Sequence, residues 1–112
     1  MKKVIVIGSG FSSLSAASYL AGAGLEVSIF EKNDIPGGRA RQLKKNGFTF
    51  DMGPSWYWMP DIFENFFQDF GKTTSDFYEL ERLDPGYQIY FKDKLLKIYA
   101  DLDKLCDTFE DI

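Results

Sequence analysis

The sequence of 112 residues predicts an α/β fold that opens with a βαβ unit, and three observations support this prediction. Residues 4–7 form a short apolar run, which is typical of a parallel strand buried on both faces. A glycine turn at residues 8–10 leads into a stretch of small residues with helical spacing. A second apolar run, residues 27–30, ends directly before Glu31 and predicts the second strand.

The glycine turn and the start of the predicted helix are suited to binding a phosphate group. Backbone N–H groups at a helix N-terminus converge on one point, and the helix dipole favours negative charge there. Gly8 makes the turn and Gly10 lets a pyrophosphate approach the backbone, while Phe11, Ser12 and Ser13 open the helix. Ser13 replaces the third glycine of the Gly-x-Gly-x-x-Gly pattern. The alternative is a simple turn between a strand and a helix.

Glu31 follows the second apolar run at the spacing where a carboxylate accepts hydrogen bonds from the ribose of a dinucleotide. Together with the glycine turn, this position predicts a dinucleotide-binding site. A carboxylate there disfavours a 2′-phosphate, so NADP is the least favoured dinucleotide. The alternative is a solvated carboxylate at the end of a strand.

A second glycine turn at residues 36–38 precedes Arg39. Adjacent glycines permit positive φ angles and a close approach of the backbone, and Gly38 stands next to the arginine. We expect the guanidinium of Arg39 to lie against a phosphate or ribose of the bound dinucleotide. The alternative is a surface ion pair between Arg39 and Asp34, which would contribute little.

Residues 48–55 read as an alternating strand with Phe48 and Phe50 on one face. The strand is expected to stop at Gly53 and Pro54, because proline cannot donate to a β-ladder. A rigid turn at Gly53, Pro54 and Ser55 can present its backbone to a flat ligand. It can equally be a plain connection.

The remainder of the chain is rich in aromatic residues. Pro60 and Gly71 mark the two ends of a predicted helix, whose apolar residues share one face: Ile62, Phe63, Phe66, Phe67 and Phe70. This face has three interpretations: core packing, an apolar wall for a long hydrocarbon substrate, and docking on a membrane surface with Trp56, Tyr57 and Trp58 as anchors.

Two further elements are predicted near the end of the chain. Residues 78–99 read as an antiparallel meander with turns at residues 84–86 and 92–94. Asp101 is a suitable N-cap for a final amphipathic helix, on which Cys106 is expected to be a small core residue. Because few parallel strands follow Glu31, we expect an incomplete domain.

Composition excludes several classes of function. The net charge is −4 and no basic cluster is present, which argues against nucleic-acid binding. The sequence contains no histidine and one cysteine, so a His-dependent triad, an internal disulfide and a Cys- or His-based metal site are excluded for this stretch. No signal-peptide or membrane-spanning run is found, and we expect a cytoplasmic location.

The motifs described above, together with residues 47–55 and 83–87, resemble the N-terminal part of the FAD-dependent carotenoid desaturases, the phytoene desaturase family. That family lies within the wider group of flavin amine oxidases and protoporphyrinogen oxidases, which share the Gly-Gly-Arg turn. The resemblance implies a Rossmann-like FAD/NAD(P)-binding βαβ start, followed by the aromatic-rich helix and the meander. It also implies that FAD is the cofactor and that Gly53, Pro54 and Ser55 lie beside the flavin.

The resemblance further implies that the full-length protein desaturates a carotenoid precursor such as phytoene by hydride transfer to the flavin. Residues 1–58 are then the N-terminal part of the FAD-binding domain, and residues 59–112 begin a substrate-binding domain for a long apolar polyene. No catalytic residue is identified, and the isolated chain is expected to be inactive. Peripheral contact with the cytoplasmic membrane, a different flavin oxidase of the same group, and a non-catalytic truncated fragment stay as alternatives.

Overall fold

The computed structural model describes residues 1–54 and 56–110. The chain forms two compact units, residues 1–74 and residues 75–112, which we describe separately. The predicted division into domains after residue 58 stays a prediction.

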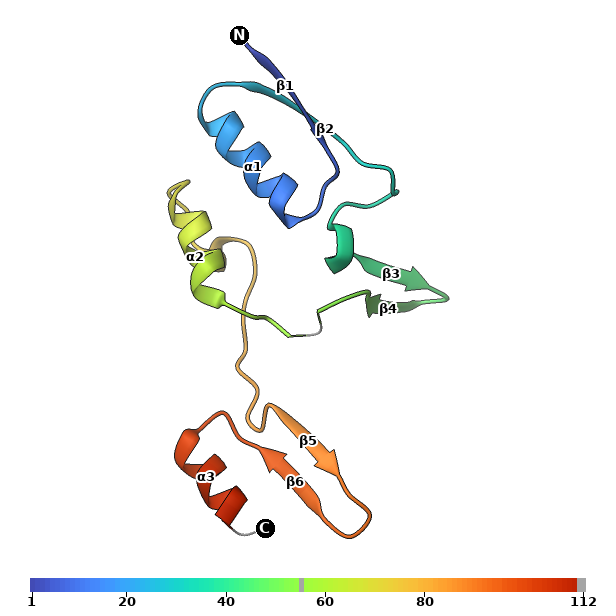
Figure 1. The fold of residues 1–112 in the computed structure, drawn as a ribbon, viewed down its shortest axis with the longest axis vertical. Helices are drawn as coiled ribbons and strands as arrows, with labels where there is room; N and C mark the ends of the chain where they lie inside the picture. Colours follow the sequence, from blue (N-terminus) through green and yellow to red (C-terminus); the bar gives the residue numbers. More distant parts are fainter. Residues whose placement is uncertain (55, 111–112) are drawn as a thin grey trace. The chain divides into compact units, whose positions relative to one another are not determined.

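The first unit opens with the predicted βαβ arrangement (Figure 1). Strands β1 (Lys3–Ile7) and β2 (Glu26–Phe30) are parallel neighbours, with Lys3 opposite Glu26 and Ile7 opposite Phe30. Helix α1 (Phe11–Gly22) connects them and contacts both strands, with Ala17 buried. This sheet has two strands, fewer than a complete doubly wound fold requires, which agrees with the prediction of an incomplete domain.

A hairpin follows the 3-10 turn η1 (Gly38–Ala40). Strand β3 (Gln42–Lys45) pairs antiparallel with β4 (Phe48–Asp51). The two residues between the strands, Asn46 and Gly47, have positive φ angles of 52° and 81°. Positive φ at both central positions is the geometry that joins antiparallel strands with the correct twist. The strand predicted from residue 48 is therefore confirmed, and it is one half of a hairpin.

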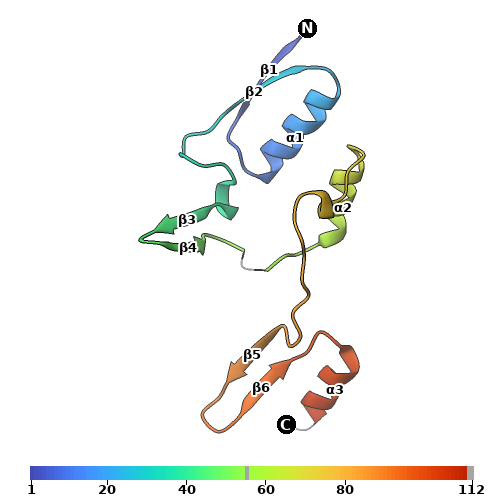
Figure 2. The same cartoon turned by 180° about the vertical axis from the view of Figure 1, so that it is seen from behind.

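Helix α2 (Pro60–Gln68) begins at proline as predicted and packs against α1 within the first unit. The contacts are between rings, measured between centroids: Phe11 lies 5.7 Å from Phe63, and Tyr19 lies 5.8 Å from Phe66 and 5.2 Å from Phe70, which follows the end of α2. Figure 2 shows the two helices from behind. Phe63 and Phe66 on this face are half-buried and contact α1, which supports core packing for part of the face.

The second unit is a hairpin and a helix. Strands β5 (Tyr87–Tyr90) and β6 (Leu95–Ile98) pair antiparallel, and α3 (Leu102–Glu110) contacts β6. Asp101 caps α3, since its Oδ1 accepts the N–H of Lys104 at 2.9 Å. The short 3-10 turn η2 (Thr74–Asp76) spans the division between the two units in the sequence.

Two sequence predictions in this unit are wrong. Residues 78–83 form no strand. The side chains of Arg82 and Asp84 instead bond to the backbone of Ala100, whose N–H donates to Asp84 at 3.0 Å and whose carbonyl accepts from Arg82 at 3.1 Å. The expected meander is therefore a single hairpin. Cys106 is exposed, since the described part of α3 has no buried residue.

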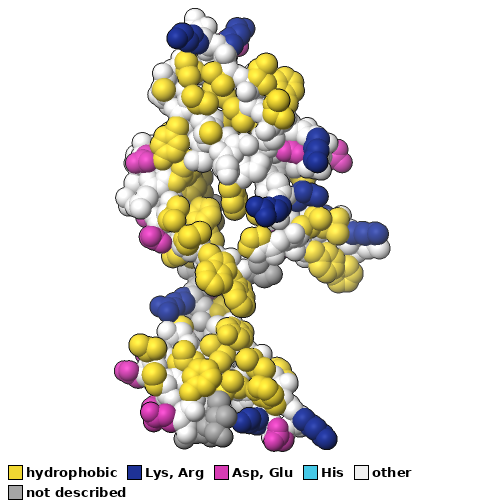
Figure 3. All heavy atoms as spheres, in the orientation of Figure 1, with side chains coloured by type: hydrophobic (Ala, Val, Ile, Leu, Met, Phe, Trp, Pro, Cys, Tyr) yellow, Lys and Arg dark blue, Asp and Glu magenta, His cyan; other side chains and the backbone are white. Residues whose placement is uncertain are grey.

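Large hydrophobic side chains are exposed on each unit, as the space-filling view shows (Figure 3). In the first unit they include Ile7, Phe30 and Trp58. Among the described residues, no helix is both long and apolar enough to cross a bilayer.

Candidate functional site

The carboxylate of Glu31 points at the glycine turn after β1. Its Oε2 accepts two hydrogen bonds from Ser9, one from the backbone N–H at 2.7 Å and one from Oγ at 2.8 Å. Its Oε1 accepts two from Asn33, from the backbone N–H at 2.9 Å and from Nδ2 at 2.6 Å. The parallel pairing of β1 and β2 makes this possible, because it brings the carboxyl ends of both strands to one edge.

These donors change the acidity of Glu31. The hydrogen bonds from the Asn33 backbone, the Ser9 hydroxyl and the Ser9 backbone lower the pKa of Glu31 from 4.5 to about 2. The side chain is therefore an ionised acceptor throughout the neutral range.

The N-terminus of α1 is open to an anion. Its N-cap is Gly10, which makes no side-chain capping bond, and its first turn holds no acidic residue. The first bond of the helix runs from the N–H of Leu14 to the carbonyl of Gly10 at 2.9 Å. The amides of Phe11, Ser12 and Ser13 thus precede the intrahelical ladder, which is the arrangement that binds phosphate.

Ser13 stands at the position of the missing third glycine, close to the glycine turn. A Cβ atom built on Gly8 would lie 3.7 Å from the Ser13 Oγ, an ordinary contact distance. The turn itself needs glycine, because Gly8 has a φ of +96°. Its N–H donates to the carbonyl of Phe30 at 2.7 Å and so continues the pairing of the strands.

The second glycine turn packs directly on the first. The N–H of Gly37 donates to the carbonyl of Ser9 at 2.8 Å. A Cβ atom on Gly38 would lie 3.0 Å from the Cα of Gly10, and one on Gly53 would lie 2.2 Å from the carbonyl oxygen of Arg39. Three backbone segments therefore meet where no side chain fits between them.

A cavity of about 800 Å³ lies beside this junction. Seven residues of the predicted cofactor-binding set line it: Gly10, Phe11, Ser12, Ser13, Arg39, Gly53 and Pro54. Gly37, Ala40 and Met52 line it as well and were not in that set. Gly8, Glu31 and Gly38 are not among the lining residues, but Glu31 bonds to Ser9 and Gly38 approaches Gly10 at the edge of the cavity. Ser55 lies outside the described residues.

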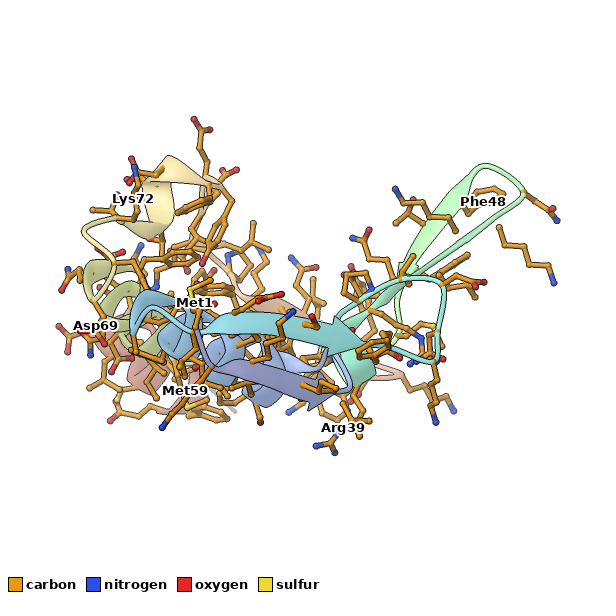
Figure 4. All side chains as sticks on the ribbon, turned by 90° about the horizontal axis from the view of Figure 1, so that it is seen from above. Met1, Arg39, Phe48, Met59, Asp69 and Lys72 are labelled. Carbon is orange, nitrogen blue, oxygen red and sulfur yellow. The ribbon has the colours of Figure 1, made fainter. Side chains whose placement is uncertain are left out.

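Arg39 supplies the positive charge of this cavity. Its side chain projects away from the ribbon near the carboxyl ends of β1 and β2, whereas Phe48 lies further along the β3–β4 hairpin (Figure 4). Within residues 1–54 and 56–110, Arg39 makes no ion pair with Asp34. Because Arg39 is exposed and lines the cavity, its guanidinium can contact a ligand there.

Sequence reasoning missed the two residues that hold Glu31. Ser9 is the middle residue of the glycine turn and is 4% exposed, and Asn33 stands two positions after the carboxylate. Asparagine close to an acidic side chain is a common local hydrogen-bond donor, and this proximity is the signal that would have identified it. Among the described residues, no group of three acidic, Cys or His side chains could hold a metal ion.

Comparison with known proteins agrees with this arrangement. Residues 6–73 match the family model for the NAD(P)-binding Rossmann-like domain, which implies a dinucleotide cofactor. The PF1083 protein from Pyrococcus furiosus, whose crystal structure is known, is 26% identical with a TM-score of 0.57 over 85% of this chain and 24% of its own.

Two curated relatives are similar over nearly the whole chain. The carotenoid 3,4-desaturase of Haloarcula japonica is 54% identical over 96% of this chain. The 4,4'-diapophytoene desaturase (4,4'-diaponeurosporene-forming) of Staphylococcus aureus strain MRSA252 is 46% identical over 98% of it. The chain spans 22% of the length of each of these proteins.

Proposed function

The chain belongs to the family of NAD(P)-binding Rossmann-like domains, and from this premise we propose that it is the FAD-binding N-terminal portion of a carotenoid desaturase. One observation carries the proposal: the ionised carboxylate of Glu31 is fixed on the glycine turn, beside a cavity that combines an open helix N-terminus with Arg39. The similarity to two desaturases supports the substrate class.

The residues that line the cavity, together with Glu31 next to it, fit an adenine dinucleotide. Free amides at the start of α1 and the guanidinium of Arg39 provide donors for a pyrophosphate, and Glu31 provides acceptors for ribose hydroxyls. The space for a ligand is the cavity of about 800 Å³ beside the junction of the three backbone segments. The proposed cofactor-binding set is Gly8, Gly10, Phe11, Ser12, Ser13, Glu31, Gly38, Arg39, Gly53, Pro54 and Ser55.

FAD in this site would supply the oxidant for desaturation: it would accept a hydride from one carbon of a polyene precursor such as phytoene, while the adjacent carbon loses a proton. The residues of this chain bind and orient the cofactor. The proton acceptor for the substrate is assigned to no residue of this chain, and we expect the isolated 112 residues to be inactive. A long apolar polyene is the proposed substrate, with the exposed aromatic residues near α2 as a candidate contact surface.

The test uses the full-length protein that contains this chain. We expect purified protein to carry a flavin absorbance band and to convert phytoene, presented in detergent or liposomes with an electron acceptor, into products with longer conjugated systems. A flavoprotein that leaves phytoene unchanged and oxidises amines or porphyrinogens would support another branch of the flavin oxidases. A protein that binds NAD and takes up no FAD would refute the cofactor assignment. A cytoplasmic location, with or without peripheral membrane contact, stays a prediction.

A further inference from the structure

The carboxylate of Glu31 is fully engaged by donors from this chain. An ionised carboxylate offers about four acceptor positions. In the structure four donors use them: the backbone N–H and Oγ of Ser9 on Oε2, and the backbone N–H and Nδ2 of Asn33 on Oε1. A ribose that binds Glu31 through its hydroxyls must therefore displace at least one of these donors.

The four donors differ in how easily they can move. The two backbone N–H groups are fixed by the turn after β1 and by the residues directly after β2. Ser9 is 4% exposed, so its hydroxyl would have to give up a hydrogen bond in a buried place. Asn33 is half-buried and lines a second cavity of about 840 Å³, into which its amide can turn and be hydrated. Asn33 Nδ2 is thus the donor that is least costly to displace.

We propose that in the free protein the side-chain amide of Asn33 occupies the acceptor position on Glu31 Oε1 that a ribose hydroxyl uses in the complex. The amide moves away from Glu31 when the dinucleotide binds. The inference rests on the proposed function, because it needs Glu31 to accept from a ribose. Asn33 is then a positioning residue: it keeps the carboxylate oriented before binding, and it competes with the ligand for Oε1. Removing only the amide leaves three donors to hold Glu31 and frees one acceptor for the sugar.

The test compares two nucleotides on the full-length apoprotein by calorimetry. ADP carries both ribose hydroxyls, and 2′,3′-dideoxy-ADP carries neither. The variants are Asn33→Ala, Asn33→Leu, which keeps the shape of the side chain without its donor, and Glu31→Gln. Asn65→Ala on α2 is the matched control, because it removes an exposed amide far along the chain from Glu31.

We expect both Asn33 variants to bind ADP about fivefold more tightly than the unmodified protein. This factor corresponds to the free energy of about one net hydrogen bond. Their affinity for 2′,3′-dideoxy-ADP should stay unchanged, and Asn65→Ala should alter neither affinity. A purely structural role for Asn33 would instead weaken the binding of both nucleotides by the same factor.

Two results would overturn the inference while leaving the proposed function intact. If the Asn33 variants bind ADP more weakly, the amide itself serves the sugar. If the Asn33 variants change the affinity for both nucleotides by the same factor, or change neither affinity, Asn33 does not compete with ribose. In both cases Glu31→Gln would still weaken the binding of ADP and leave the binding of 2′,3′-dideoxy-ADP unchanged. If Glu31→Gln binds ADP as well as the unmodified protein, the ribose assignment fails, and the inference fails with it.

Discussion

The carboxylate of Glu31 accepts the backbone N–H of Ser9 at 2.7 Å, so the end of β2 is fixed on the turn that follows β1. Because the acceptor is ionised, the bond is stronger than a hydrogen bond between neutral groups. It links the ends of two adjacent strands. Gly37 donates to the carbonyl of the same Ser9 residue at 2.8 Å. One turn residue therefore organises both sides of the proposed dinucleotide site.

The first prediction concerns pH. Because the pKa of Glu31 is lowered from 4.5 to about 2, its contribution to stability is fully present above about 4.5 and is lost as the pH falls towards 2. We expect Glu31→Gln to lower the denaturation midpoint at pH 6, and we expect this difference to shrink between pH 4.5 and 2. Denaturant titrations of both proteins at several pH values measure it. A difference that stays constant over this range would contradict the assignment.

The second prediction separates binding from folding at Gly10. A Cβ atom there meets nothing within 4 Å, and the φ of −72° suits any residue. Gly10→Ala should therefore change the free energy of unfolding by less than about 0.5 kcal/mol. The added methyl group would occupy the cavity wall where a pyrophosphate approaches the backbone. FAD affinity, measured by flavin fluorescence, should fall by about tenfold or more. Unchanged affinity would count against the pyrophosphate site.

The third prediction uses Gly38 and Gly47 as a matched pair. Both have positive φ, +60° and +81°, but only Gly38 has a neighbour within reach of a Cβ atom, the Cα of Gly10 at 3.0 Å. Gly47→Ala should cost about 1 kcal/mol from the backbone conformation and leave FAD affinity unaltered. Gly38→Ala should cost about 1 kcal/mol more and also weaken FAD binding. Equal effects of the two substitutions would show that the contact between the glycine turns is unimportant.

Local patterns in the sequence predicted most of the first unit. The apolar runs, the glycine turn and the spacing to Glu31 predicted β1, α1, β2 and the position of the carboxylate. These features depend on nearby residues, so sequence reasoning reaches them. Pro60 and Asp101 marked the starts of α2 and α3 for the same reason.

Sequence reasoning missed the β3–β4 hairpin and several hydrogen bonds between residues far apart in the sequence. The β3–β4 hairpin went unrecognised because every residue of β3 is exposed and shows no apolar alternation, although Asn46-Gly47 is a strong turn signal. Residues 78–83 form no strand, and the side chains of Arg82 and Asp84 bond to the distant backbone of Ala100. The hydrogen bonds of Asn33 and Gly37 depend on the folded positions of two loops, which spacing alone does not give.

The fourth prediction concerns the tyrosine between the two helices of the first unit. Tyr19 donates its hydroxyl proton to Asp69 at 2.5 Å, and this bond raises the pKa of Tyr19 above 10.0. Because the pKa in the folded state is raised, the bond contributes below about pH 10 and is lost as the pH rises through the folded value. Ultraviolet titration of the phenol should show one tyrosine that ionises late, and Asp69→Asn should bring it back towards 10. A titration unaffected by Asp69→Asn would contradict the contact.

The last prediction tests whether the aromatic face of α2 is a packing surface. Phe66 is half-buried and its ring lies 5.8 Å from that of Tyr19 and 5.2 Å from that of Phe70, whereas Ile62 on the same helix is 55% exposed. Phe66→Ala removes ring contacts with α1, so it should destabilise the protein by about 2 kcal/mol. Ile62→Ala should cost less than about 0.5 kcal/mol, because its side chain is already largely in water.

Thermal unfolding and limited proteolysis near α2 measure both effects. If α2 instead serves mainly to contact a polyene substrate, Phe66→Ala should leave the stability unchanged and raise the KM for phytoene-like substrates in the full-length protein. The two outcomes separate because loss of packing is seen without substrate, whereas loss of a substrate contact is seen only with it. The ring contacts between α1 and α2 favour the first outcome.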